Sequence, residues 1–303
     1  MQSQIQITVS AGSLAPIKAR LSVAAASAGK RKGTKAAAPA APVGMRLEDM
    51  PQFAREELGF AGLNIPTSML AGRTLAHLED LRDRADRAGC PILVLVDNHP
   101  MDFHRQGKAA AERLTRLAAA GTRLGCGDMA IKCVGVDDEA SLAGAAKNAR
   151  LALNEIESYG LGVLVRPGEG ATGDPPQLMD FIKRIGGFRI GAMPSFAHAA
   201  ETTEFVATLR RLAPYAHCVA ATVNAYSRNG RHPGHDLEEA VRAVVSVGYQ
   251  GTLCVEFAGT GDPQKHIVKA RESMAAVLSA DVEDDVVAED ETPPAEAEPE
   301  IAD

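Results

Sequence analysis

The residues best suited to chemistry stand at the ends of short apolar runs. Glu256 closes the run Leu253-Cys254-Val255, which is typical of a strand buried on both faces. A carboxylate in such a place is costly unless it is solvated, paired with a cation or bound to a metal. Glu256 is therefore the first candidate for a functional group.

Polar side chains follow other apolar runs of the chain in the same way. If these runs are parallel strands of one barrel, their carboxyl ends meet at one mouth, where sites are built. The sequence then predicts a ring of amides, hydroxyls, cations and carboxylates there. The ring contains Asn64, Asp97, Asn98, His99, Lys132, Arg166, Glu169, Ser195, His198, Thr222, Asn224, Tyr226 and Glu256.

Several of these residues also have a structural interpretation. Glu256 can pair with Arg166 across the mouth, and Lys132 inside a barrel needs a carboxylate partner. Residues 97–99, Asp-Asn-His, are also typical of a turn. His232 and His235 lie in a long polar loop above the mouth, where they either cover a substrate or belong to a flexible segment.

The elements that must position these residues follow one repeating order of short apolar strand, polar loop and amphipathic helix. Eight such units predict a parallel α/β sheet closed into a (β/α)8 TIM barrel of one domain. Neither a G-x-G-x-x-G nor a P-loop follows any strand, so we expect no nucleotide cofactor. The expected strands are 5–10, 62–65, 92–96, 129–133, 162–165, 189–193, 218–222 and 252–256. The expected helices are 47–58, 75–88, 109–124, 140–159, 176–185, 202–212, 236–247 and 263–278.

Composition divides the chain into four parts. Residues 1–23 hold the first strand and the start of an insertion, 24–45 are a low-complexity disordered insertion, and 46–280 complete the barrel. Residues 281–303 are expected to be a disordered acidic tail, since they hold eleven acids and no base. The first 45 residues hold six Lys or Arg and no acid, which leaves 26 bases and 28 acids between them.

A barrel this close to neutral lacks the basic surface that grips nucleic acid, so we expect no nucleic-acid partner. No segment is apolar for long enough to span a membrane. The five cysteines are scattered through or beside apolar runs, which is typical of reduced thiols in a cytoplasmic protein. The oligomeric state is not indicated.

The last unit, residues 236–257, carries a helix, a Gly-Tyr-x-Gly turn and a strand ending in Glu256. Together with the eight-unit layout and the opening REELGFAGLNI of residues 55–65, it resembles the xylose isomerase-like TIM-barrel superfamily. This group includes sugar-phosphate isomerases and epimerases, hydroxypyruvate isomerases and the endonuclease IV group. Glu256 matches the glutamate that binds metal in that family.

The resemblance implies a divalent cation, Mg, Mn or Zn, held by carboxylates and an imidazole. Glu256, Glu169 and His198 are the expected metal ligands and catalytic residues. Arg166 stands where the family has a glutamate, Ser195 where it has an aspartate, and residues 222–225 lack the family's His-x-x-Asp.

The resemblance also implies an isomerase or epimerase that moves a proton at a carbon next to a carbonyl. Its substrate would be a small sugar, a sugar phosphate or a hydroxy acid. The expected substrate-binding residues are Asn64, Asp97, His99, Lys132, Arg166 and Asn224. Two alternatives are a metal-free pseudoenzyme or barrel that binds an anionic small molecule, and an endonuclease that acts at abasic sites in DNA.

Overall fold

A computed structural model describes residues 5–17 and 44–290, with side chains described up to residue 280. The predicted insertion at 24–45 falls almost wholly outside these residues, as do the last residues of the predicted tail. Eight parallel strands form one sheet in the order β6-β5-β4-β3-β2-β1-β8-β7. They are β1 (Gln6–Ser10), β2 (Leu63–Pro66), β3 (Ile92–Met101), β4 (Asp128–Cys133), β5 (Gly162–Arg166), β6 (Ile190–Ala192), β7 (Cys218–Val223) and β8 (Thr252–Phe257).

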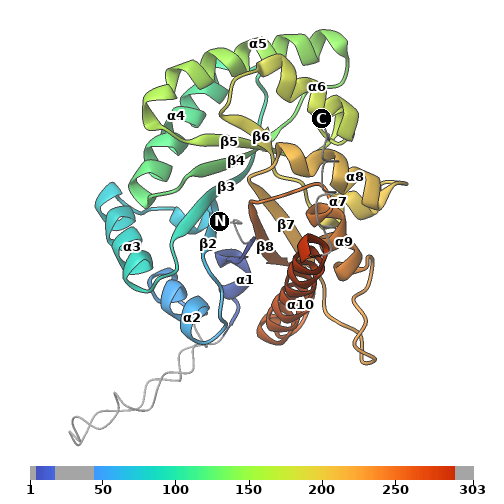
Figure 1. The fold of residues 1–303 in the computed structure, drawn as a ribbon. Coiled ribbons are helices and arrows are strands. Elements are labelled where there is room, and N and C mark those ends of the chain that lie inside the picture. The colour runs from blue at the N-terminus through green and yellow to red at the C-terminus, as the bar shows by residue number, and fades with distance from the viewer. Residues whose placement is uncertain (1–4, 18–43, 291–303) are drawn as a thin grey trace, which may run out of the picture.

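The two edges of this sheet meet at β6 and β7. Parallel bridges join Ala192 to Ala216 and Ser195 to Ala220, and the Ala220 N–H donates to the Pro194 carbonyl at 2.8 Å. The sheet is therefore closed into a barrel, as the eight-fold repeat predicts. Helices surround the strands (Figure 1). The α-helices of the described residues are α1 (Ala11–Leu14), α2 (Met50–Glu56), α3 (Leu75–Arg87), α4 (Gly107–Leu124), α5 (Glu139–Glu155), α6 (Pro175–Ile185), α7 (Phe196–Glu201), α8 (Phe205–Leu212), α9 (Leu237–Val245) and α10 (Pro263–Asp290).

The helix boundaries follow from local signals. Asp138 and Asp174 cap α5 and α6 with their side chains, and α6 starts with Pro175 at a position where proline needs no N–H partner. Helix α10 continues to Asp290, whereas the sequence analysis ends it at residue 278. No Gly or Pro interrupts residues 264–292, so nothing in that stretch breaks the helix.

The apolar core has two parts, as a closed barrel requires. A large layer lies between the strands and the helices, and a small cluster fills the inside of the barrel. Because side chains alternate along a strand, one set of residues points into the barrel and its neighbours point out to the helices. The inner cluster consists of Val94, Val96, Ala130, Leu164, Met193, Cys218, Ala220 and Cys254.

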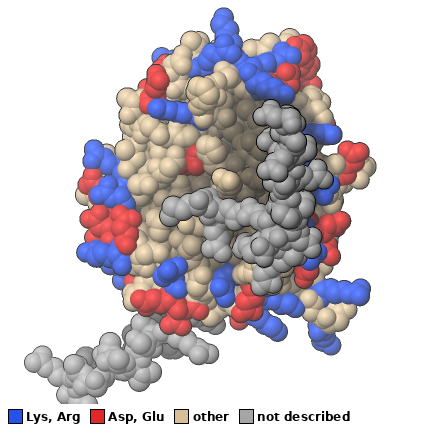
Figure 2. Space-filling view, in the orientation of Figure 1, with Lys and Arg blue, Asp and Glu red and all other residues tan. Residues whose placement is uncertain are grey.

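The surface of the barrel is mixed in charge. In Figure 2 Lys and Arg alternate with Asp and Glu around the outline of the visible face. All five cysteines are buried and free. None of the helices in the described ranges combines the length and apolar character needed to cross a bilayer.

Candidate functional site

The alternation of the strands predicts which side chains reach the mouth. Two residues beyond Ala130, Leu164 and Cys254, each of which points into the barrel, stand Lys132, Arg166 and Glu256. Thr222 stands in the same relation to Ala220 on β7. The last inward positions of four strands are therefore polar, while the layer beneath them is apolar.

Arg166 is the centre of this mouth. Its Nη1 donates to the side-chain oxygen of Asn98 at 2.6 Å, and its Nη2 donates to Glu256 Oε2 at 3.2 Å. The side chains of Arg166 and Glu256 are each 20% exposed, so the pair is half-buried and open to a ligand. One guanidinium thus connects the ends of β3, β5 and β8, and the structure contains the Glu256–Arg166 pair that the sequence offered as an alternative.

Lys132 stands beside Arg166 on the neighbouring strand. The two residues are paired in the β4–β5 register, so two cations occupy the same level of the barrel. The Nζ of Lys132 lies 3.8 Å from Glu169 Oε1, and the Glu169 side chain is 89% exposed. Glu169 comes from the loop after β5 and is solvated, so this contact leaves Lys132 available to an anion.

Two hydroxyls and an imidazole belong to β7, where Thr222 is the register partner of Glu256, and to the segment after β6. Ser195 Oγ and Thr222 Oγ1 are hydrogen-bonded at 3.0 Å. His198 Nε2 donates to the Gly173 carbonyl at 2.8 Å, which leaves Nδ1 as the acceptor. That Nδ1 is buried and has no partner among the described residues.

Asn64 and Asn224 lie at different depths. Asn64 is fully buried and donates to Cys218 Sγ at 3.3 Å, while its side-chain oxygen has no partner within the described part of the chain. It belongs to the barrel interior below the mouth. Asn224 begins the loop after β7, and its N–H donates to His232 Nε2 at 2.8 Å.

Asp97 is not brought together with the other predicted site residues. It is 1% exposed and accepts two hydrogen bonds from Arg113 of α4, at 2.6 and 2.8 Å, and one from Thr67 at 2.8 Å. Burial alone would raise the pKa of Asp97, but the hydrogen bonds from Arg113, Thr67 and the His99 N–H hold it below its usual value. Asp97 therefore fastens β3 to α4, and the exposed His99 contributes its backbone to that arrangement.

Sequence reasoning missed Arg113 and the ion pairs of the rim. Arg113 lies on the same face of α4 as the buried Ala110 and Leu117, three and four residues away. An arginine on an apolar face needs a buried partner, and that was the available signal. Its partner is Asp97, a residue of β3 that directly follows the apolar run 92–96.

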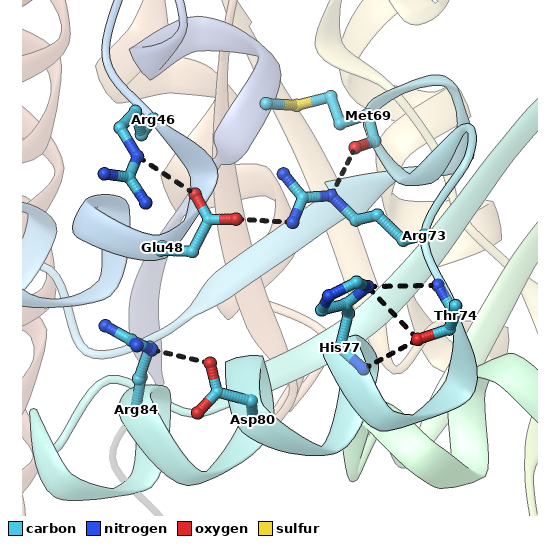
Figure 3. Close-up of polar contacts among 8 residues, drawn as sticks. All are labelled: Arg46, Glu48, Met69, Arg73, Thr74, His77, Asp80 and Arg84. Carbon is cyan, nitrogen blue, oxygen red and sulfur yellow. Dashed lines mark hydrogen bonds and ion pairs between the residues drawn. The ribbon is translucent and has the colours of Figure 1, made fainter.

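A second set of contacts fixes the rim beside β2. Glu48, before α2, lies between Arg73, whose Nη1 is 2.5 Å away, and Arg46, at 3.6 Å (Figure 3). The hydrogen bond from Arg73 lowers the pKa of Glu48, outweighing the effect of burial. Thr74 caps α3 and accepts from the His77 N–H. The loops after β1 and β2 are therefore held together at the mouth.

The donor set at the mouth does not fit a divalent cation. Such ions in proteins are held by several carboxylate or imidazole groups around one point. Among the residues that the structure describes, no three or more His, Cys, Asp or Glu side chains are placed to hold a metal. The expected ligands Glu256, Glu169 and His198 are directed to Arg166, Lys132 and the Gly173 carbonyl.

The family of the chain is clear. Residues 53–277 match the model of the xylose isomerase-like TIM barrel, and the chain belongs to this family. A comparison with curated proteins gave no significant match.

Solved structures share the fold at low sequence identity. An L-ribulose 3-epimerase is 14% identical, with 95% of this chain and 100% of that chain covered and a TM-score of 0.72. A Mycobacterium smegmatis xylose isomerase-like TIM-barrel protein in complex with magnesium is also 14% identical, with coverages of 91% and 96% and a TM-score of 0.63. A D-psicose 3-epimerase from Clostridium cellulolyticum H10, solved with D-tagatose, is 16% identical, with coverages of 76% and 90% and a TM-score of 0.57.

Proposed function

We propose that this chain is an isomerase- or epimerase-type enzyme in which the Arg166 guanidinium supplies the positive charge that a divalent metal ion supplies in a metal-dependent enzyme. Its substrate is a small sugar derivative or hydroxy acid with a carbonyl group and a negative charge. The observation that carries the proposal is the Arg166 guanidinium, which bridges Asn98 and Glu256 at the mouth. Membership of a family that includes sugar epimerases supports the reaction type.

The residues divide the chemistry between them. Removing a proton from the carbon next to a carbonyl places negative charge on the carbonyl oxygen, and a fixed guanidinium stabilises that oxyanion. Glu256, next to Arg166, takes the proton from carbon and returns it to the neighbouring carbon, which gives the isomer. In an epimerisation a second group, for which Glu169 is the candidate, delivers a proton to the opposite face of the same carbon. Lys132 binds the anionic group of the substrate, because it stands at the same level as Arg166. Ser195 and Thr222 bind substrate hydroxyls.

The test follows deuterium at carbon. Sugar phosphates and hydroxy acids are screened for binding by calorimetry and for exchange of the carbon-bound proton in D2O, with EDTA and with added Mn²⁺. We expect exchange that EDTA does not remove. Arg166→Gln should weaken binding by about tenfold or more, because a hydrogen bond to a charged group is worth roughly 1.5–3 kcal/mol. Glu256→Gln should still bind ligand but lose exchange by about 100-fold or more.

A control variant and a contrary outcome complete this design. Arg82→Gln, on the exposed surface of α3, removes an arginine charge away from the mouth and should leave both readings unchanged. Exchange that requires Mn²⁺, with stoichiometric metal binding that Glu256→Gln abolishes, would overturn the role given to Arg166.

A second candidate function is a barrel that binds an anion without catalysis. The observation that favours it is the pairing of both candidate carboxylates, Glu256 with Arg166 and Glu169 with Lys132. Binding that depends on Arg166 and Lys132, without deuterium incorporation into any bound ligand, would identify this function instead.

A further inference from the structure

Three histidines gather around the loop between β7 and α9, residues 224–236. His232 and His235 belong to the loop, and their ring centroids lie 4.4 Å apart. His266 lies in α10 and stacks on Tyr226 at 6.0 Å, and Tyr226 in turn contacts the His232 ring at 5.4 Å. The candidate site uses none of these imidazoles, so their clustering calls for an explanation of its own.

His232 is locked in one neutral tautomer by two backbone groups. Its Nδ1 lies 3.1 Å from the His235 carbonyl, which can only accept, so Nδ1 carries the proton. Its Nε2 lies 2.8 Å from the Asn224 N–H, which can only donate, so Nε2 must be bare. A second proton on this ring would bring two donors face to face and break the bond that ties the start of the loop to its end.

His266, in α10, also accepts a hydrogen bond from a backbone N–H of the loop. The Tyr226 N–H donates to His266 Nδ1 at 3.1 Å, so this nitrogen must also be unprotonated. The ring stacks on Phe257 at 5.6 Å with an angle of 3° between the planes, and on Tyr226 with an angle of 16°. Two backbone N–H groups at the start of the loop, those of Asn224 and Tyr226, thus depend on two neutral imidazoles.

His235 adds a buried ring to this arrangement. It packs against Phe196 at 5.9 Å and Phe205 at 5.6 Å, and its Nε2 is buried without a partner in the described residues. Burial, helped by the neighbouring His232, lowers the pKa of His235 to about 4. Burial also lowers the pKa of His232.

The charged groups around the cluster do not compensate for added protons. Asp236 and Glu238 of the α9 end, Lys269 of α10 and Arg231 of the loop line an adjoining cavity of about 500 Å³. Two of these four groups are acidic and two are basic, so their charges cancel. Asp236 is the nearest acid, and one of its oxygens already accepts two N–H groups as the cap of α9. Its charge raises the pKa values of His232 and His235, but burial of the two rings lowers them by more. Lys269 lies over the Tyr226 ring at 4.5 Å.

We propose that His232, His235 and His266 form a proton-operated latch. The latch holds residues 224–236 closed while the His232 and His235 imidazoles are neutral and His266 Nδ1 accepts the Tyr226 N–H, and it releases the loop when His232 and His235 take up protons. Release frees the Asn224 and Tyr226 N–H groups, directly after the strand that carries Thr222. The mouth of the barrel therefore changes shape on the β7 side as the pH falls, whatever reaction the mouth performs.

The direction of the pH effect follows from linkage. A free histidine titrates near pH 6.5, and in the closed loop the pKa values of His232 and His235 are lower. Well above pH 6.5 the closed and open forms bind the same number of protons at these sites. Below it the open form binds more, so closure weakens as the pH falls toward the lower values. Each such imidazole multiplies the ratio of open to closed forms by up to about tenfold per pH unit.

Hydrogen exchange read by mass spectrometry tests this latch on the full chain. Protection of residues 224–236 is measured from pH 8 to 5 and corrected for the intrinsic exchange rate at each pH. We expect protection to be flat above pH 7 and to fall by about tenfold or more by pH 5. Residues 67–73, a rim loop without histidine, serve as the internal control and should show no such fall.

Variants that cannot titrate complete the test. His232→Gln and His266→Asn keep an acceptor at the position of Nε2 and Nδ1, and His235→Phe keeps the ring between Phe196 and Phe205. The triple variant should retain its protection at pH 5. A flat profile in the wild type overturns the proposal, and so does a fall that persists in the triple variant. If the triple variant does not fold, His235→Phe alone should reduce the steepness of the fall, and an unchanged slope would count against the latch.

Discussion

Two arginine–carboxylate pairs stand at adjoining parts of the barrel, and they differ in every respect that decides function. Asp97 is 1% exposed and has all its partners inside the protein, with two contacts to Arg113 below 3 Å. Glu256 is 20% exposed and has one contact to Arg166 at 3.2 Å. The first pair points from the barrel wall to α4, and the second lies at the mouth. A complete set of hydrogen bonds marks a structural pair, and an incomplete one leaves room for a ligand.

Removing the buried carboxylate should give the largest effect. Asp97→Ala leaves Arg113 unpaired against an apolar face, so we expect a loss of about 3–5 kcal/mol in the free energy of unfolding. Urea denaturation measures it. Asp80→Ala, in an exposed pair with Arg84 on α3, is the matched control and should change stability little. A loss below about 1 kcal/mol for Asp97→Ala would contradict the structural role.

The same conservative change in both pairs sharpens the contrast. Lysine cannot reproduce a two-pronged contact, so Arg113→Lys should cost about 1–3 kcal/mol in unfolding free energy. Arg166→Lys should cost less than about 1 kcal/mol but weaken ligand binding by about tenfold. Thermal denaturation and calorimetry separate the two effects. Equal losses of stability in both variants would show that the mouth pair is structural as well.

A third pair, at the opposite end of the strands, should respond to pH. His217 Nδ1 lies 2.9 Å from Asp128, and this hydrogen bond raises the pKa of His217 despite burial. Its stabilisation is therefore complete below about pH 6.5 and is lost as the pH rises through the higher folded value. His217→Asn keeps a donor but no charge. The stability difference between wild type and variant should be about 0.5–1 kcal/mol at pH 5.5, because the pair is half-exposed, and smaller at pH 8.5. A difference that grows with pH would contradict this sign.

The rim pair should give the smallest effect. The Glu48 side chain is only 20% exposed, but one of its two partners, Arg46, is 70% exposed, and Gln keeps the shape of Glu. Glu48→Gln should therefore cost no more than about 0.5–1 kcal/mol in unfolding free energy, and less in high salt. Chemical denaturation at low and high ionic strength measures this. A cost that is insensitive to salt would mean that the rim depends on the shape of Glu48 more than on its charge.

The fold was predictable because it rests on periodicity. The eight strands lie within a few residues of the expected ranges, apart from β3, which extends to Met101. The short helix α7 was not among the expected helices. The members of the mouth were less predictable. Asp97 and Asn98 are neighbours with the same kind of sequence signal, yet one binds Arg113 and the other Arg166. The orientation of each side chain decides this, and a register shift in β3 after Val96 makes that orientation unreadable from the sequence.

The partners of the predicted residues depend on distances across the barrel, which no local pattern encodes. His198 is directed to the Gly173 carbonyl, 25 residues away, and Glu256 meets Arg166, 90 residues away. The pairing of Glu256 with Arg166 was foreseen from the sequence, but the carboxylate that meets Lys132 was not. For the same reason the catalytic and substrate-binding roles given to the site residues stay predictions.

The seam between β6 and β7 has a consequence for how the protein is made. Strand β7 has its full hydrogen-bonded ladder only with β8, and β8 pairs in turn with β1, which is made first. On the β6 side two isolated bridges complete the ring. A nascent chain that still lacks Thr252–Phe257 therefore leaves β7 without its ladder and leaves one edge of β1 unpaired. Closure of the barrel thus has to wait until the strand that carries Glu256 has left the ribosome.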